Sequence, residues 1–123
     1  GVLHADERSA VALKESLAIS KKYAAAPRQC YYNAAMIAVR EHDLYDYVEG
    51  IATMMIPTEH AWLVDKAWGW VIDPTWAPLQ RRSRDKIKDY FGVRIPIELV
   101  RARVLEAELA GPVLPHVIGQ IRK

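Results

Sequence analysis

The chain has 123 residues, of which 51% are hydrophobic and 26% charged, and its formal net charge is +2. This length and composition suit one globular domain with its own core, so a single domain over residues 1–123 is expected. The small net charge gives no support for nucleic-acid binding, and no apolar stretch approaches the roughly 20 residues of a membrane-spanning helix.

Two helices are predicted in the first third of the chain. A stretch without Gly or Pro predicts a helix from about Asp6 to Ala25, with Asp6 as a candidate N-cap and Pro27 as the stop. The small apolar residues after Cys30 predict a second helix, with Cys30 in its first turn. The free N–H groups and positive dipole of a helix N-terminus stabilise a thiolate. Cys30, the only cysteine, is therefore a candidate nucleophile, although most lone cysteines are packed core residues.

The middle of the chain has the pattern of an antiparallel sheet. Strands are predicted over Tyr47–Pro57, with Gly50 as a possible bulge, and over His60–Asp65. Lys66–Gly69 is predicted to be a turn, and Trp70–Asp73 a third strand. Because the connections are short, consecutive strands are expected to be antiparallel neighbours.

The last third of the chain is more polar and predicts mainly helices. Residues from Ser83 to Tyr90 are compatible with a helix, and Tyr90–Pro96 with a loop or short strand. Helical spacing then extends over Ile97–Leu109, and the tail from Val113 to Lys123 has no clear pattern. The fold class predicted from the whole pattern is α+β, with helices before and after a central antiparallel sheet.

Three polar residues lie at the ends of these predicted elements. Cys30 begins a helix, His60 begins a strand, and Asp73 ends the next strand. In an antiparallel hairpin the start of one strand lies beside the end of the next, so His60 and Asp73 are expected to be neighbours. A carboxylate beside an imidazole fixes its tautomer, and the other ring nitrogen can then face a thiol. The backbone N–H of Cys30 and the side chain of Gln29 are candidate donors to an oxyanion.

Three short segments carry a family resemblance. Residues 29–34 (QCYYNA), 57–64 (PTEHAWLV) and 70–76 (WVIDPTW) resemble the transglutaminase-like superfamily, which lies within the papain-like cysteine fold. The resemblance covers roughly Pro27 to Trp76, under half of the chain. It implies that Cys30 is the nucleophile, His60 the base and Asp73 the orienting acid. It also implies a papain-like core, in which the helix that begins at the cysteine packs on a small antiparallel sheet.

The chain departs from this family in one position and adds no sign of a metal. Many members use a tryptophan upstream of the cysteine in the oxyanion hole, but none precedes Cys30, which leaves Gln29 and Tyr23 as substitutes. Trp62 and Trp76 are candidate walls of a substrate groove. One cysteine and scattered histidines give no metal-ligand spacing, and there is no EF-hand-like acidic cluster, so no metal or cofactor is expected.

The expected function is that of a thiol-dependent amide hydrolase or acyltransferase acting on a protein or peptide. Protease, glutamine deamidase and transglutaminase share a thioester on the cysteine, and hydrolysis is favoured over cross-linking because water is always available. The alternative is an inactive domain of the same fold that binds proteins. A basic stretch is either a solvated helix face or a docking patch for an acidic partner; it comprises Arg81, Arg82, Arg84, Lys86 and Lys88.

The sequence says little about location or assembly. The opening residues lack the basic start and apolar stretch of a secretory signal peptide, so a cytoplasmic location is expected by default. Neither nucleic acid nor membrane is expected as a partner, and no feature predicts an oligomeric state.

Overall fold

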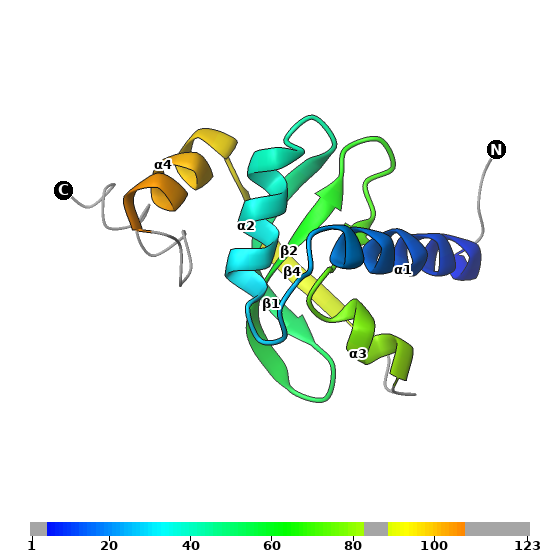
Figure 1. Ribbon diagram of the computed structural model, residues 1–123. Coiled ribbons are helices and arrows are strands. Elements are labelled where there is room, and N and C mark those ends of the chain that lie inside the picture. Colours follow the sequence, from blue (N-terminus) through cyan, green and yellow to red (C-terminus); the bar gives the residue numbers. More distant parts are fainter. Residues whose placement is uncertain (1–4, 83–88, 108–123) are drawn as a thin grey trace.

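The computed structural model describes residues 5–82 and 89–107. Within these ranges the chain forms four helices and one four-stranded antiparallel sheet, which confirms the α+β class. The helices are α1 (Ala5–Lys22), α2 (Cys30–Arg40), α3 (Ala77–Arg82) and α4 (Ile97–Ala107). The strands are β1 (Tyr45–Thr53), β2 (Pro57–Asp65), β3 (Val71–Ile72) and β4 (Asp89–Ile95). In Figure 1, α2 crosses in front of the sheet, with α1 and α3 to one side of it and α4 to the other.

The sheet has the strand order β3-β2-β1-β4. β1 and β2 form a long hairpin, paired from Tyr45 opposite Asp65 to Thr53 opposite Pro57. β3 is much shorter and pairs only with Leu63 and Val64 of β2. Upstream of Leu63, this edge of β2 therefore has no strand partner among the described residues. The chain leaves the sheet after Ile72.

Each face of the sheet has its own apolar layer, because side chains alternate along a strand. Alanines of α2 let that helix approach one face closely, where residues of the sheet and of α4 complete the main core. The buried members of this layer include Ala34, Ala35, Ile37, Ala38, Tyr47, Leu63, Ile72 and Val100. The opposite face carries a smaller cluster of Val48, Ala52, Trp62 and Val64, against which Trp76 and Tyr90 pack.

The first helix differs from the prediction at both ends. Asp6 lies inside α1, which begins at Ala5, and is not its N-cap. The helix ends at Lys22 and not at Ala25, because Ala24 adopts a left-handed conformation with φ 50°. A residue in that conformation ends a helix before Pro27 can do so.

The strand boundaries also differ from those predicted. β1 ends at Thr53, and Pro57 begins β2, so His60 lies inside a strand and not at its start. The pairing of β1 continues through Gly50 on both sides without an extra residue, so Gly50 is not a bulge. The third strand contains only Val71 and Ile72, and not Trp70–Asp73.

The C-terminal predictions are tested only in part. Asp89–Ile95 is a strand, which decides between the two alternatives for that segment and places Tyr90 in β4 and not at the end of a helix. α4 confirms the predicted helix as far as Ala107. The rest of the predicted helix before Tyr90, much of the basic stretch and the tail after residue 112 lie outside the described residues.

Gly50 is needed where β1 and β4 approach one another. A Cβ at this position would collide with the backbone carbonyl of Phe91 and the Cα of Gly92. Because backbone atoms cannot move aside like a flexible side chain, we expect Gly50→Ala to lower the free energy of unfolding by about 3 kcal/mol or more. Urea unfolding measures this loss. The neighbouring Ile51→Ala, at a side chain that is 41% exposed, should cost at most about 1 kcal/mol; an equal cost for both variants would contradict the close approach.

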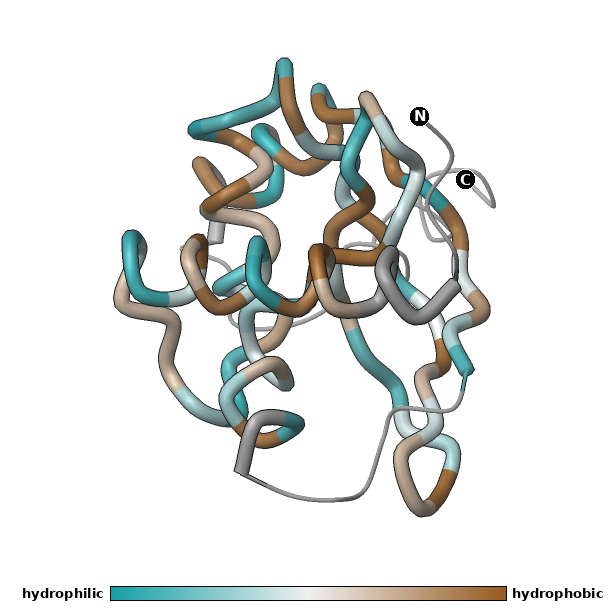
Figure 2. Tube along the Cα trace, turned by 90° about the vertical axis from the view of Figure 1, so that its right-hand side faces the viewer, coloured by the Kyte–Doolittle hydropathy of each residue, from teal (hydrophilic) through white to brown (hydrophobic). Residues whose placement is uncertain are grey.

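None of the described helices is long and apolar enough to cross a membrane. Figure 2 shows the corresponding pattern, in which hydrophobic and hydrophilic residues alternate along the coloured part of the chain.

Candidate active site

Cys30 is the first residue of α2, as predicted. The loop that leads to it is held in an uncommon conformation, since Arg28 has φ 63°. The side chain of Asn33 braces this loop by accepting from the N–H of Ala26 at 3.1 Å and donating to its carbonyl at 2.8 Å. The same amide donates to Oγ1 of Thr75 at 2.9 Å. Asn33 therefore ties the start of α2 to the segment that follows β3.

The N-terminus of α2 has unused backbone donors. The first hydrogen bond of the helix runs from the N–H of Asn33 to the carbonyl of Gln29 at 2.8 Å, so the N–H groups of Cys30, Tyr31 and Tyr32 precede it. Gln29 occupies the N-cap position, but its side chain makes no capping hydrogen bond and is exposed. This end of the helix can therefore donate to an anion beside Cys30.

His60 and Asp73 form the predicted pair. Nε2 of His60 lies 2.7 Å from Oδ2 of Asp73, and the two residues are only 1% and 4% exposed. The contact does not arise from strand pairing, because the β2–β3 ladder stops at Leu63 opposite Ile72. It arises because the chain turns after Ile72 and directs Asp73 back toward His60 along the unpaired edge of β2.

Both carboxylate oxygens of Asp73 are fixed by further donors. Oδ1 accepts from the backbone N–H groups of Thr75 at 3.2 Å and Trp76 at 2.9 Å. Oδ2 accepts from the hydroxyl of Tyr90 at 2.8 Å, in addition to His60. The backbone N–H of Asp73 donates to Oγ of Ser16 in α1 at 3.1 Å. These hydrogen bonds fix the position and orientation of the carboxylate.

Cys30 approaches the same imidazole from α2. Burial lowers the pKa of His60, but hydrogen bonds with Asp73 and Cys30 and their negative charges raise it more, so that this pKa becomes about 9. Since Nε2 is occupied by Asp73, Nδ1 is the ring nitrogen left for the sulfur. Cys30, His60 and Asp73 therefore come together in the predicted order, with the thiol half-buried and the carboxylate behind the ring.

The raised pKa of His60 has a measurable consequence. Titration of the imidazole by NMR is expected to give a midpoint near pH 9, against ~6.5 for a free histidine. Because the folded-state pKa is the higher one, the stabilisation is complete below about pH 6.5 and is lost as the pH rises through about 9. A midpoint at or below ~6.5 would show that burial outweighs the two partners.

The tryptophans separate into two pairs. Trp76 stacks on the ring of His60 with centroids 3.8 Å apart, and Trp62 lies further along the same face of the sheet at 6.1 Å. Trp62 is only 2% exposed, which places it in the core beneath the site, whereas Trp76 is partly exposed. Trp68 and Trp70 stack on one another 5.4 Å apart, near the turn before β3.

Three residues of this network were not assigned a role from the sequence. Asn33 lies in the segment 29–34, which carries part of the family resemblance. An amide among alanines, in a helix that packs on a sheet, indicates a buried side chain that needs hydrogen-bond partners. Ser16 and Tyr90 lie far from the other site residues in the chain and gave no local signal. Only the packing of α1 and the pairing of β4 with β1 bring them to Asp73.

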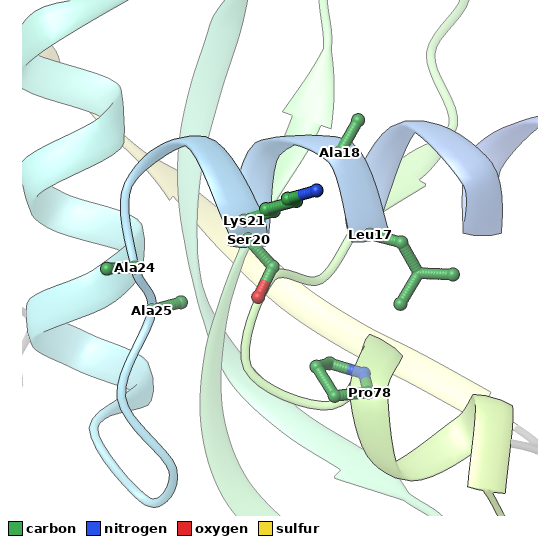
Figure 3. A pocket seen from close by; sticks show the side chains of 7 residues that line it. All are labelled: Leu17, Ala18, Ser20, Lys21, Ala24, Ala25 and Pro78. Atoms are coloured by element: carbon green, nitrogen blue, oxygen red, sulfur yellow. The ribbon is translucent and has the colours of Figure 1, made fainter.

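Two cavities border the loop between α1 and α2. One of about 720 Å³ separates the end of α1 from α3, where Leu17 and Ser20 point toward Pro78 (Figure 3). The other, of about 320 Å³, lies between the loop after α1 and the outer side of α2, next to Tyr32 and Met36. Neither of these cavities is lined by Cys30, His60 or Asp73, the three residues of the candidate triad.

The described residues contain no group of three or more His, Cys, Asp or Glu side chains that could hold a metal ion. Comparison with known proteins found no matching family model, curated protein or solved structure.

Proposed function

We propose that this protein is a cysteine enzyme that cleaves an amide bond or transfers its acyl group through a thioester on Cys30. The observation that carries the proposal is the buried contact of 2.7 Å between His60 and Asp73, with Cys30 on the same imidazole. A thiol, an imidazole and an oriented carboxylate at a helix N-terminus are the parts that nucleophilic acyl transfer requires. The arrangement supports a papain-like, transglutaminase-like core.

In the first half of the proposed reaction, Cys30 is the nucleophile and His60 is the acid. At neutral pH the imidazole of His60, whose pKa is raised to about 9, is protonated. The proposed nucleophile is the thiolate form of Cys30, which an imidazolium and a helix N-terminus both stabilise. The thiolate attacks the carbonyl carbon, and the oxygen takes up the negative charge. The N–H groups at the start of α2 stabilise this oxyanion, and the exposed Gln29 side chain is a further donor. His60 then gives its proton to the departing nitrogen, so that an amine leaves and a thioester forms.

In the second half the thioester is resolved by water or by an amine. His60 accepts the proton of the attacking group, the carbon–sulfur bond breaks, and the thiolate and imidazolium are restored. Hydrolysis is favoured over cross-linking, because water is always available to resolve the thioester and a small domain offers few elements for a second, amine-binding site. The substrate class is a protein or peptide amide, either of the backbone or of a glutamine side chain.

The test of this proposal is covalent capture. We expect an amide-mimetic, thiol-directed inhibitor such as a peptide aldehyde or vinyl sulfone to modify Cys30 under reducing conditions, with mass spectrometry locating the adduct. A panel of unstructured protein substrates, analysed for new termini and for released ammonia, then distinguishes proteolysis from deamidation. A dansylated amine added to the same panel reports acyl transfer.

The control for capture is the same protein with His60 replaced by Ala. It should retain the thiol but lose the rapid adduct, because the thiolate has lost its partner. A parent protein that gives no adduct, or one no faster than the variant, would contradict the proposal and favour the alternative of a protein-binding module.

A further inference from the structure

A tyrosine from the far edge of the sheet reaches the acid of the triad. Tyr90 belongs to β4, which is separated from β2 by the whole of β1. Its hydroxyl donates to Oδ2 of Asp73 at 2.8 Å, the same oxygen that lies 2.7 Å from Nε2 of His60. Oδ2 of Asp73 therefore takes part in two hydrogen bonds of almost equal length.

The packing around Tyr90 shows how its hydroxyl is aimed. Tyr90 lies opposite Ala52 of β1, on the face of the sheet that carries the smaller apolar cluster. Its ring packs edge-on against Trp62, with centroids 4.9 Å apart. Trp62 in turn occupies the space over Gly92, where a Cβ would come within 2.7 Å of the indole ring. The glycine, the indole and the phenol thus form one packed row that ends at Asp73.

Tyr90 cannot exchange roles with His60 as a base. Burial, followed by the charge and hydrogen bond of Asp73, raises the pKa of Tyr90 far above its ordinary value. The phenol therefore stays protonated around neutral pH, where its hydroxyl donates to Oδ2 of Asp73.

We propose that Tyr90 is a positioning residue of the triad, which orients Asp73 and limits how strongly the carboxylate holds the proton on His60. This inference rests on the proposed function, because the limit matters only if His60 must release that proton. A weaker acceptor at Oδ2 makes the imidazolium a better acid toward the departing amine. Without the hydroxyl of Tyr90, Oδ2 of Asp73 would hold the proton of His60 more tightly.

The variant that tests this role is Tyr90→Phe, which removes the hydroxyl and keeps the ring. We expect the NMR titration midpoint of His60 to rise from about 9 by up to about one unit, since a charge-assisted hydrogen bond no longer competes for Oδ2. Acylation of Cys30 by p-nitrophenyl acetate, followed as nitrophenolate release, should fall little. Turnover of an amide, where His60 must protonate the amine, should fall by roughly 3- to 10-fold.

Tyr45→Phe is the matched control. Tyr45 is also a buried tyrosine of the same sheet whose hydroxyl donates to a carboxylate, Oε2 of Glu15 at 2.9 Å, but it does not contact the triad. It should leave the titration of His60 unchanged.

Two titratable groups act directly on His60: Cys30 from α2 and Asp73 after β3. The NMR titration of His60 is therefore repeated in a Cys30→Ala background, which separates the effect of Asp73 and Tyr90 from that of the thiol. A midpoint of His60 that is the same in Tyr90→Phe and in the parent would overturn the role of Tyr90. Because the titration needs no turnover, this result is independent of whether Cys30 proves to be reactive.

Discussion

Replacing Cys30 with Ser is expected to abolish amide turnover, with a loss of at least about 1000-fold. Serine keeps the size of the side chain and its place at the start of α2, but its hydroxyl does not ionise at neutral pH. The ion pair with His60 therefore cannot form, and the remaining donors at the helix N-terminus have no nucleophile to assist. Turnover of the substrate found in the panel, measured on purified variant and parent, gives the ratio.

The fold should survive this change, because Cys30 is only half-buried and belongs to neither apolar cluster. We expect the free energy of unfolding to change by less than about 1 kcal/mol. Activity in Cys30→Ser within tenfold of the parent would show that the amide is cleaved by another group, and the proposed thioester would have to be abandoned.

Replacing Asp73 with Asn is the second change with a large expected effect. Oδ1 of Asp73 accepts from the N–H groups of Thr75 and Trp76, so the carbonyl of an asparagine must occupy that place. Its NH₂ group then faces Nε2 of His60, which must become an acceptor, and the ring proton moves to Nδ1. The imidazole can no longer take a proton from the thiol of Cys30. Loss of the correct tautomer is expected to lower turnover by roughly 10³- to 10⁴-fold.

The same change should lower the titration midpoint of His60, because the negative charge of Asp73 is one cause of its raised pKa. Asp46→Asn is a suitable control, since Asp46 forms surface ion pairs with Lys66 and Arg94 in the same sheet, away from the triad. It should leave both turnover and titration unchanged. Asp73→Asn with full turnover would mean that Asp73 only holds the loop after β3.

The sequence was most informative where chemistry is local. Cys30 at the start of a helix could be predicted, because the loop containing Pro27 and the alanines that follow define the helix boundary. The contact between His60 and Asp73 was also predicted, but for a reason that is only partly right. The prediction assumed a strand pair reaching both residues, whereas β3 contains only Val71 and Ile72 and the contact is made by the turn after it.

The rest of the site depends on long-range packing that a local pattern does not encode. Tyr90 reaches Asp73 because β4 pairs with β1 in one particular register, which no short-range signal fixes. Ser16 reaches Asp73 because α1 packs beside β3, which brings together two residues that are far apart in the chain. The role of Asn33 could have been predicted, since a buried amide in an alanine-rich helix requires hydrogen-bond partners.

The most direct test of the central claim is the rate of Cys30 alkylation by iodoacetamide across pH ~4 to 10, in the parent, in His60→Ala and in the control His42→Ala. A free thiol reacts slowly below its pKa of ~8.5, because only the thiolate is the nucleophile. If the Cys30–His60 pair is present, the parent and His42→Ala should react rapidly at pH ~6, and His60→Ala should follow the profile of a free thiol. If Cys30 is inert, or if its profile is the same with and without His60, the triad does not operate and the proposed enzyme activity is contradicted.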